Sequence, residues 1–153
     1  MTVATSLELR SPAFGNDERI PTRHTGEGED ISPALEWSGA PDGTRELALI
    51  CDDPDAPLPY GWVHWVGFKI PPETTAIPEG GGSRFVEGIN DFGRIGYGGP
   101  LPPPGHGTHH YYFWLYALNK EVDASPGISK AELLQKIAGN VISQARIVGT
   151  YSR

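Results

Sequence analysis

The sequence predicts a mainly β protein, an antiparallel β-sandwich with a C-terminal α-helix and long loops rich in glycine and proline. Apolar and aromatic residues form runs of strand length, most clearly at residues 62–70 and 111–118. The 20 glycines and 15 prolines gather between such runs, which indicates shaped connections rather than a disordered tail. One stretch, after residue 129, repeats apolar residues at helical spacing.

The length and composition predict a single cytoplasmic domain over residues 1–153. A chain of this length, 38% apolar, is sufficient for one hydrophobic core. The sequence contains no apolar run near 18 residues and no basic start followed by an apolar stretch, so we expect no membrane span and no secretory signal. Cys51 is the single cysteine, which excludes an internal disulfide and suits a reducing compartment. Its apolar setting predicts a buried thiol.

The first half of the chain contains short predicted strands at residues 3–9, 35–37 and 46–51, with a polar loop at 11–30. The clearest strand of this half is 62–70. Its alternation is expected to place one set of side chains on a common face: Trp62, His64, Val66, Phe68 and Ile70.

The second half contains a long loop at residues 88–108, a strand at 111–118, the helix and a last strand at 147–151. Residues 111–118 are apolar on both faces, so we expect this strand to be central, and 147–151 to lie at an edge. Ser129 and Glu132 form a capping box at the start of the helix. The helical spacing then includes Leu133, Leu134, Ile137, Ala138, Val141, Ile142 and Ala145, with Gly139 weakening the helix from inside.

The charge pattern argues against a nucleic-acid partner. The net charge is −7 and no cluster of lysine and arginine is present, whereas nucleic-acid binding depends on neutralising phosphates with such residues. The aromatic residues lie mostly in predicted strands, which favours a role in the core over base stacking.

Three segments place polar groups beside strand ends. In the first, Pro54 and Pro57 stiffen the loop that holds Asp53 and Asp55. These carboxylates either bind a ligand or form a turn by accepting hydrogen bonds from local backbone N–H groups. The second is His64, which is either a satisfied core residue or the floor of a pocket.

The third segment is the glycine-rich stretch 96–111. Glycine lets the backbone approach a ligand closely, and successive free N–H groups form a concave anion site. The alternative is a loop shaped only to cross the sheet edge. His109 and Tyr111 are two residues apart and point to the same side if the strand has begun there.

Together these groups suggest a site for a phosphate-like anion. A carboxylate beside a histidine favours the imidazolium form, which donates hydrogen bonds to an anion. Tyr111 adds a hydroxyl and the glycine-rich segment adds N–H groups. Asp53 or Asp55 could instead hold an ammonium group, so a zwitterionic head group would use both kinds of partner.

Two other kinds of site compete with this hypothesis. An Asp–His pair could act as an acid and base in a hydrolase or lyase, but no serine or cysteine lies in a recognisable nucleophile motif. A metal could use His64, His109 and an aspartate, with His106 and His110 nearby, but the spacing is not diagnostic. We therefore expect no cofactor, no metal and no catalytic residues.

The ordered motifs resemble the phosphatidylethanolamine-binding protein family, in its prokaryotic Raf kinase inhibitor-like branch. The matching segments run along nearly the whole chain from about residue 8. They are 31–37, Asp53-Pro54-Asp55-Ala56-Pro57, 61–65, Asn90-Asp91-Phe92-Gly93, 96–103, His109-His110-Tyr111 with Phe113, and 149–153.

The resemblance implies a β-sandwich with a small pocket at one end that accepts phosphate-type anions and phosphorylated head groups. It implies that the pocket is lined by Asp53, Asp55, His64, His109 and Tyr111, with Gly99 and Pro100 at its rim. Some family members inhibit kinases or proteases through surface contacts, and prokaryotic members often form homodimers. The pocket would then play no part in the inhibition.

The chain departs from the family pattern at two positions. His110 stands where the family usually has an arginine, which is permanently charged and bidentate, whereas histidine is neither. Support of the pocket loop is therefore expected to be weaker or pH-sensitive. Leu101 stands where a small residue or cysteine is common, which predicts a bulkier rim.

Overall fold

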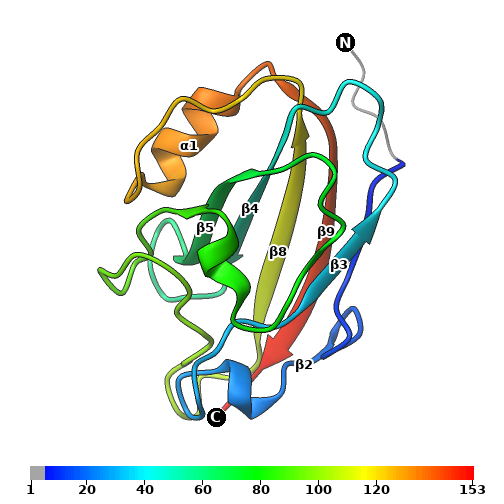
Figure 1. Cartoon of the computed structure of the whole chain (residues 1–153). Coiled ribbons are helices and arrows are strands. Elements are labelled where there is room, and N and C mark those ends of the chain that lie inside the picture. Colours follow the sequence, from blue (N-terminus) through cyan, green and yellow to red (C-terminus); the bar gives the residue numbers. More distant parts are fainter. Residues whose placement is uncertain (1–5) are drawn as a thin grey trace.

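A computed structural model describes residues 6–153 and contains two packed β-sheets and one α-helix (Figure 1). The larger sheet has six strands in the order β2 (Glu18–Arg19), β9 (Val141–Tyr151), β8 (His109–Leu118), β4 (Glu46–Asp53), β5 (Trp62–Ile70) and β7 (Val86–Glu87). The smaller sheet has three, in the order β1 (Glu8–Arg10), β3 (Leu35–Ser38) and β6 (Ala76–Ile77). Neighbouring strands are antiparallel except β2 and β9, so the predicted mainly antiparallel sandwich is confirmed.

The main core lies between the two sheets. Trp37 of the small sheet packs in one buried cluster with residues of the large sheet such as Leu49 and Phe113. Strand β4 contributes to this cluster through Leu47, Leu49 and Cys51, and burial raises the pKa of the Cys51 thiol. The buried thiol expected from the sequence is therefore confirmed.

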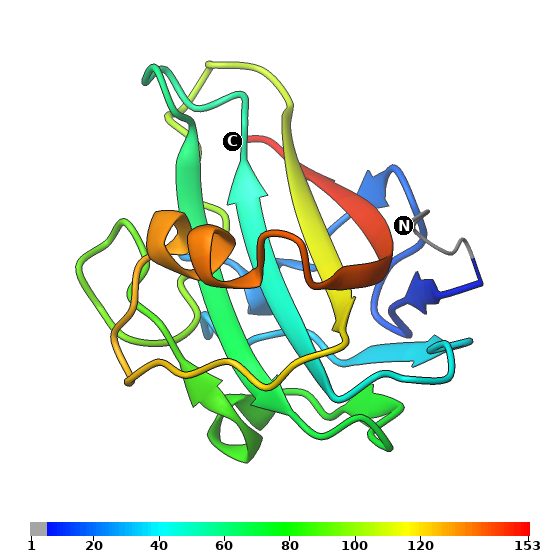
Figure 2. The ribbon, with the colours of Figure 1, turned by 90° about the horizontal axis from the view of Figure 1, so that it is seen from above.

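A second core lies on the outer face of the large sheet, where helix α1 (Lys130–Ile137) crosses β4 and β5 (Figure 2). Ala48 and Ile50, the alternate residues of β4, pack there with Leu133 and Ile137 of the helix. Strand β4 is thus buried on both faces, which explains its continuous apolar run. Among residues 6–153 no helix is long and apolar enough to cross a membrane.

Helix α1 begins as predicted but ends early. Ser129 caps it, with the backbone N–H of Glu132 donating to the serine side chain in a complete capping box. The predicted continuation to Ala145 is wrong, because Gly139 adopts a left-handed conformation with φ of 81° and ends the helix. Residues 141–151 form strand β9 instead, so their apolar spacing belongs to a strand.

The other strand predictions are mostly confirmed. Strands β3, β4, β5 and β8 cover the predicted segments, and β8 is central because it lies between β9 and β4. Of the predicted strand 3–9, residues 3–5 lie outside the described residues, and Glu8–Arg10 form β1. The segment 11–30 is not loop throughout, since it contains β2 and the 3-10 helix η1 (Thr22–His24). Strand β2 pairs with β9, so residues 147–151 are not a free edge.

The loop after β5 also contains unpredicted short elements: β6, β7 and the 3-10 helix η2 (Gly81–Arg84). Residues 88–108 contain no named strand or helix and form the expected long loop, with one isolated bridge between Ile89 and Ile95.

Candidate functional site

A cavity of about 290 Å³ opens where three strands of the large sheet meet at one end. Strand β4 ends at Asp53, β5 begins at Trp62 opposite it, and β8 begins at His109. Since neighbouring strands here are antiparallel, these three chain ends lie at one edge of the sheet. The cavity is lined by Asp53, Ala56, Pro57, Leu58, Trp62, His64, Phe92, Leu101, Pro102, Pro103, His109 and Tyr111.

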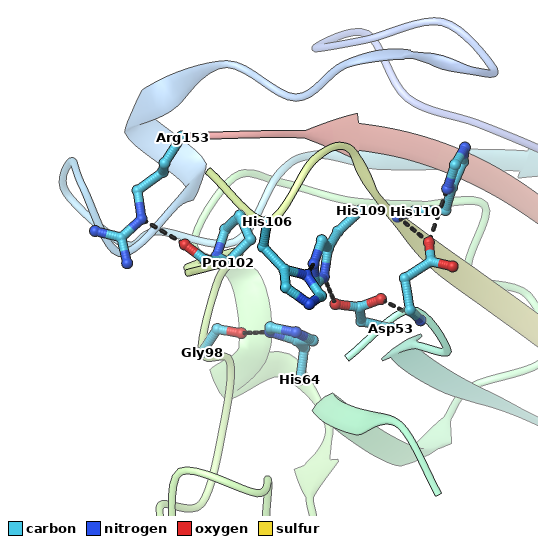
Figure 3. Close-up of polar contacts among 9 residues, drawn as sticks. Asp53, His64, Gly98, Pro102, His106, His109, His110 and Arg153 are labelled. Atoms are coloured by element: carbon cyan, nitrogen blue, oxygen red, sulfur yellow. Dashed lines mark hydrogen bonds and ion pairs between the residues drawn. The ribbon is translucent and has the colours of Figure 1, made fainter. Parts of the chain in front are cut away.

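Asp53 and His109 form a buried pair at the wall of this cavity (Figure 3). The Nδ1 of His109 lies 2.6 Å from Oδ2 of Asp53, and the two residues are 2% and 3% exposed, respectively. The other carboxylate oxygen of Asp53 accepts the backbone N–H of Asp55 at 2.7 Å. This is also the turn that the sequence offered as an alternative, so the carboxylate both shapes its loop and orients an imidazole.

His106 is hydrogen-bonded to the second ring nitrogen of His109. Its Nδ1 lies 2.6 Å from Nε2 of His109, and the ring centroids are 4.8 Å apart. The carboxylate of Asp53 accepts a hydrogen bond from Nδ1 of His109, and Nε2 of the same ring is hydrogen-bonded to His106. The three side chains therefore form a hydrogen-bonded chain from His106 through His109 to Asp53.

A β-bulge places His64 in the cavity. Cys51 pairs with Trp65 whereas Asp52 pairs with Val63, so His64 is an extra residue on β5. The bulge turns the ring toward the inner side of the sheet, where it meets Tyr111 with ring centroids 5.1 Å apart.

The expected common face of residues 62–70 is therefore wrong. Val66 and Phe68 face the helix, whereas His64 faces the cavity. A second register shift, beside Lys69 with φ of 58°, returns Ile70 to the inner core. Two bulges in one strand defeat a strict two-residue alternation.

His64 donates the hydrogen on Nδ1 to the carbonyl oxygen of Gly98 at 2.6 Å (Figure 3). Burial lowers the pKa of the ring, outweighing that hydrogen bond and the charge of Asp53, which raise it. The ring is therefore neutral at physiological pH, and Nε2 is an acceptor. This differs from the imidazolium that the sequence suggested, because the carboxylate pairs with His109 and not with His64.

Tyr111 and Trp62 each add a side-chain hydrogen-bond donor to the lining. Burial raises the pKa of the Tyr111 hydroxyl, with Asp53 adding to the shift, so this group stays protonated. The indole N–H of Trp62 is buried and has no acceptor among the described residues. Within residues 6–153 no lysine or arginine lines the cavity, and no cluster of three potential metal ligands occurs.

Three of the predicted site residues lie behind the cavity walls rather than in them. Asp55 accepts both the backbone N–H and the ring Nδ1 of His110 at 2.8 Å, on the far side of β8 from Tyr111. Gly99 donates its N–H to Asp30 at 2.7 Å, and the carbonyl of Pro100 accepts the N–H of Gly26 at 2.9 Å. The structure brings together Asp53, His64, His109 and Tyr111, and gives Asp55, Gly99 and Pro100 bonds that position the surrounding loops.

Several lining residues were not singled out from the sequence. Phe92 packs against the rings of Trp62 and His64, with centroids 5.4 and 5.5 Å apart, and its motif was the available signal. Leu101, noted as a bulky rim residue, does line the cavity, next to Pro102 and Pro103. The C-terminal Arg153 supports this wall, because its Nε donates to the carbonyl of Pro102 at 2.6 Å.

Comparison with known proteins places this architecture among characterised sequences and structures. The model of the phosphatidylethanolamine-binding protein family matches residues 10–152. A UPF0098 protein of Methanothermobacter thermautotrophicus is 46% identical, over 96% of this chain and 99% of its own. A homologue of phosphatidylethanolamine-binding proteins from Chlamydia trachomatis has a similar structure, with a TM-score of 0.92 and 34% identity over 98% of this chain and 99% of its own. The structure of Escherichia coli YbcL is also similar, with a TM-score of 0.91 and 35% sequence identity over 97% of this chain and 99% of its own.

Proposed function

Because this chain belongs to the phosphatidylethanolamine-binding protein family, we propose that its cavity binds a small phosphorylated head group and takes up a proton as it does so. The observation that supports this most is the state of His64. It is a buried, neutral imidazole in a cavity whose lining has no permanent cation. An anion placed there would favour protonation of Nε2.

The proton coupling has a definite sign. The pKa of His64 is lowered in the free protein by burial, so an anion that raises it must draw a proton from solution. Binding is therefore stronger at low pH, where that proton costs less. A phosphate monoester adds to the effect, since its own second pKa is about 6 and its monoanion carries a P–OH donor.

The size of the cavity favours a head group over a whole lipid. Pockets for drug-sized ligands occupy roughly 300–1,000 Å³, and about 290 Å³ is at the small end of that range. The apolar walls, with Leu58 and Leu101 partly exposed, would exclude water from the bound phosphoryl group. An ammonium group, if present, has the carboxylate of Asp53 within the same cavity.

A ligand panel tests this proposal. Phosphate, phosphoethanolamine and ethanolamine are added at millimolar concentration and the melting temperature is recorded. The two phosphorylated compounds should raise it and ethanolamine should not, since ligand binding stabilises the folded state by mass action. No shift with either phosphorylated compound would contradict the proposal.

A second candidate function is acid–base catalysis, which the Asp53–His109 pair favours. Among the described residues, the cavity lining contains no serine, threonine, cysteine or lysine, and the raised pKa of Tyr111 makes its hydroxyl a poor nucleophile. A nucleophile would therefore be water, a group of the substrate, or the carboxylate or imidazole of the lining itself. Turnover that disappears in Asp53→Asn would establish this candidate over simple binding.

Regulation of a kinase or protease, homodimer formation and a cytoplasmic location remain predictions from the sequence. A protein inhibitor that acts through its surface would keep its activity when His64 is replaced, because this residue is 3% exposed and unable to contact a partner directly.

A further inference from the structure

His109 has no free ring nitrogen in this structure. Nδ1 is bonded to Asp53 and Nε2 to His106, each at 2.6 Å. A ligand that is to hydrogen-bond the His109 ring must therefore displace His106, since Asp53 is buried and fixed by a second bond to the Asp55 N–H. His106 is the exposed and less constrained of the two partners.

His106 lies between two glycines that have open space beside them. Gly105 and Gly107, on either side, adopt positive φ values of 74° and 92°, and no atom lies within 4 Å of a Cβ placed on either. Backbone bonds join the N–H of His106 to Pro103 and the N–H of Gly105 to Arg153. Beyond its own backbone N–H, the described contacts of His106 are with the His109 ring.

We propose that His106 is a gate residue: it occupies His109 in the free protein, and a phosphorylated ligand displaces it to reach the same nitrogen. The proposal rests on the head-group site proposed above. It deepens that site, because a group that replaces His106 must form a hydrogen bond with Nε2 of His109. A phosphoryl group can do so, since it carries oxygen acceptors and, as a monoanion, a P–OH donor.

Removing the gate should strengthen binding. If only the open protein binds, the apparent affinity is the intrinsic affinity multiplied by the open fraction. One hydrogen bond of ordinary net strength favours the closed over the open protein by about 3- to 10-fold. We expect His106→Ala to lower the Kd for phosphoethanolamine, measured by calorimetry at pH 6.5, by about that factor. Thr108→Ala, an exposed change on the same loop, is the matched control and should leave the Kd unchanged.

The sign of the His106→Ala effect decides the proposal. Weaker binding would mean that His106 contacts the ligand, and equal binding would mean that it does not compete; either result overturns the gate while leaving the head-group site intact. Absence of binding by both wild type and variant overturns the head-group site and the gate with it. Ring nitrogen chemical shifts give an independent check: the Nε2 resonance of His109 should change in His106→Ala, because its hydrogen-bond partner is removed.

Discussion

His64 donates its Nδ1 hydrogen to the carbonyl oxygen of Gly98 across 2.6 Å, and this bond decides which nitrogen meets a ligand. Gly98 in turn donates its backbone N–H to the carbonyl of His64 at 3.0 Å, so the glycine-rich segment and the bulge of β5 hold each other. The tautomer is fixed by a backbone group that carries no charge, and Nε2 is left as the position where a proton is gained on binding.

Replacing His64 should weaken ligand binding. We expect His64→Ala to raise the Kd for phosphoethanolamine by about 10-fold or more, because a hydrogen bond to a charged group contributes about 1.5–3 kcal/mol. Calorimetry measures this. His24→Ala is the matched control, since His24 is also buried and its Nδ1 donates to the carbonyl of Ile31 at 2.8 Å, away from the cavity. Equal losses in both variants would mean that His64 acts only through the fold.

Replacing His110 by the arginine usual in the family should leave ligand affinity nearly unchanged, because Asp55 and His110 lie outside the cavity lining. The hydrogen bonds from His110 lower the pKa of Asp55, outweighing burial, which raises it. That stabilisation is present above the unfolded pKa near 4 and is lost as the pH falls through the lower folded value.

The measurement for His110→Arg is urea unfolding at pH 8. Because the pair is 42–44% exposed, a permanent charge should add at most about 1 kcal/mol. A large change in ligand affinity would contradict the position of this pair behind the wall.

Removing the side chain of Arg153 should loosen the wall formed by Pro102. We expect Arg153→Ala to raise the Kd for phosphoethanolamine by about 2- to 10-fold, as for the loss of one hydrogen bond, with little change in melting temperature. Arg10→Ala is the control, since Arg10 forms an exposed pair with Glu36 in the small sheet. An effect of the same size in both variants would point to net charge and not to the wall.

Gly139 gives a test of the helix end. With φ of 81°, Gly139→Ala should destabilise the protein by about 1 kcal/mol, and Gly139→Asn by less, because asparagine tolerates this conformation better. No atom lies within 4 Å of the added Cβ, so the cost comes from the backbone alone. Urea unfolding measures both variants. Stabilisation by alanine is the result expected of a helix that continues past Gly139, and it would contradict the observed end.

Local patterns predicted the elements whose physics is local. The capping box at Ser129 and the apolar run of β8 needed only neighbouring residues. The end of the helix was missed because Val141, Ile142 and Ala145 fit a helical and a strand pattern equally well. Pairing of β9 with all ten residues of β8 decides between them, and that pairing is not visible in either segment alone.

The site was predictable in part. Asp53 and His109 are 56 residues apart in the sequence, and the order of the family motifs predicted that they line one pocket. The face of His64 was not predictable, because a bulge depends on the register of two strands. The place of His106 depends on how the loop after Pro104 turns back, and its contact with His109 left no mark beyond the spacing of three residues.

Proton uptake on binding is the most direct test of the proposed site. Binding of the sulfate ester of ethanolamine is measured by calorimetry at pH 7 in two buffers of different ionisation enthalpy. This ligand does not titrate near neutral pH, so any proton taken up must go to the protein. A net uptake above zero and at most one proton, reduced in His64→Ala, together with tighter binding at pH 6 than at pH 8, is the expected result. Binding with no proton uptake and an affinity independent of pH would contradict it.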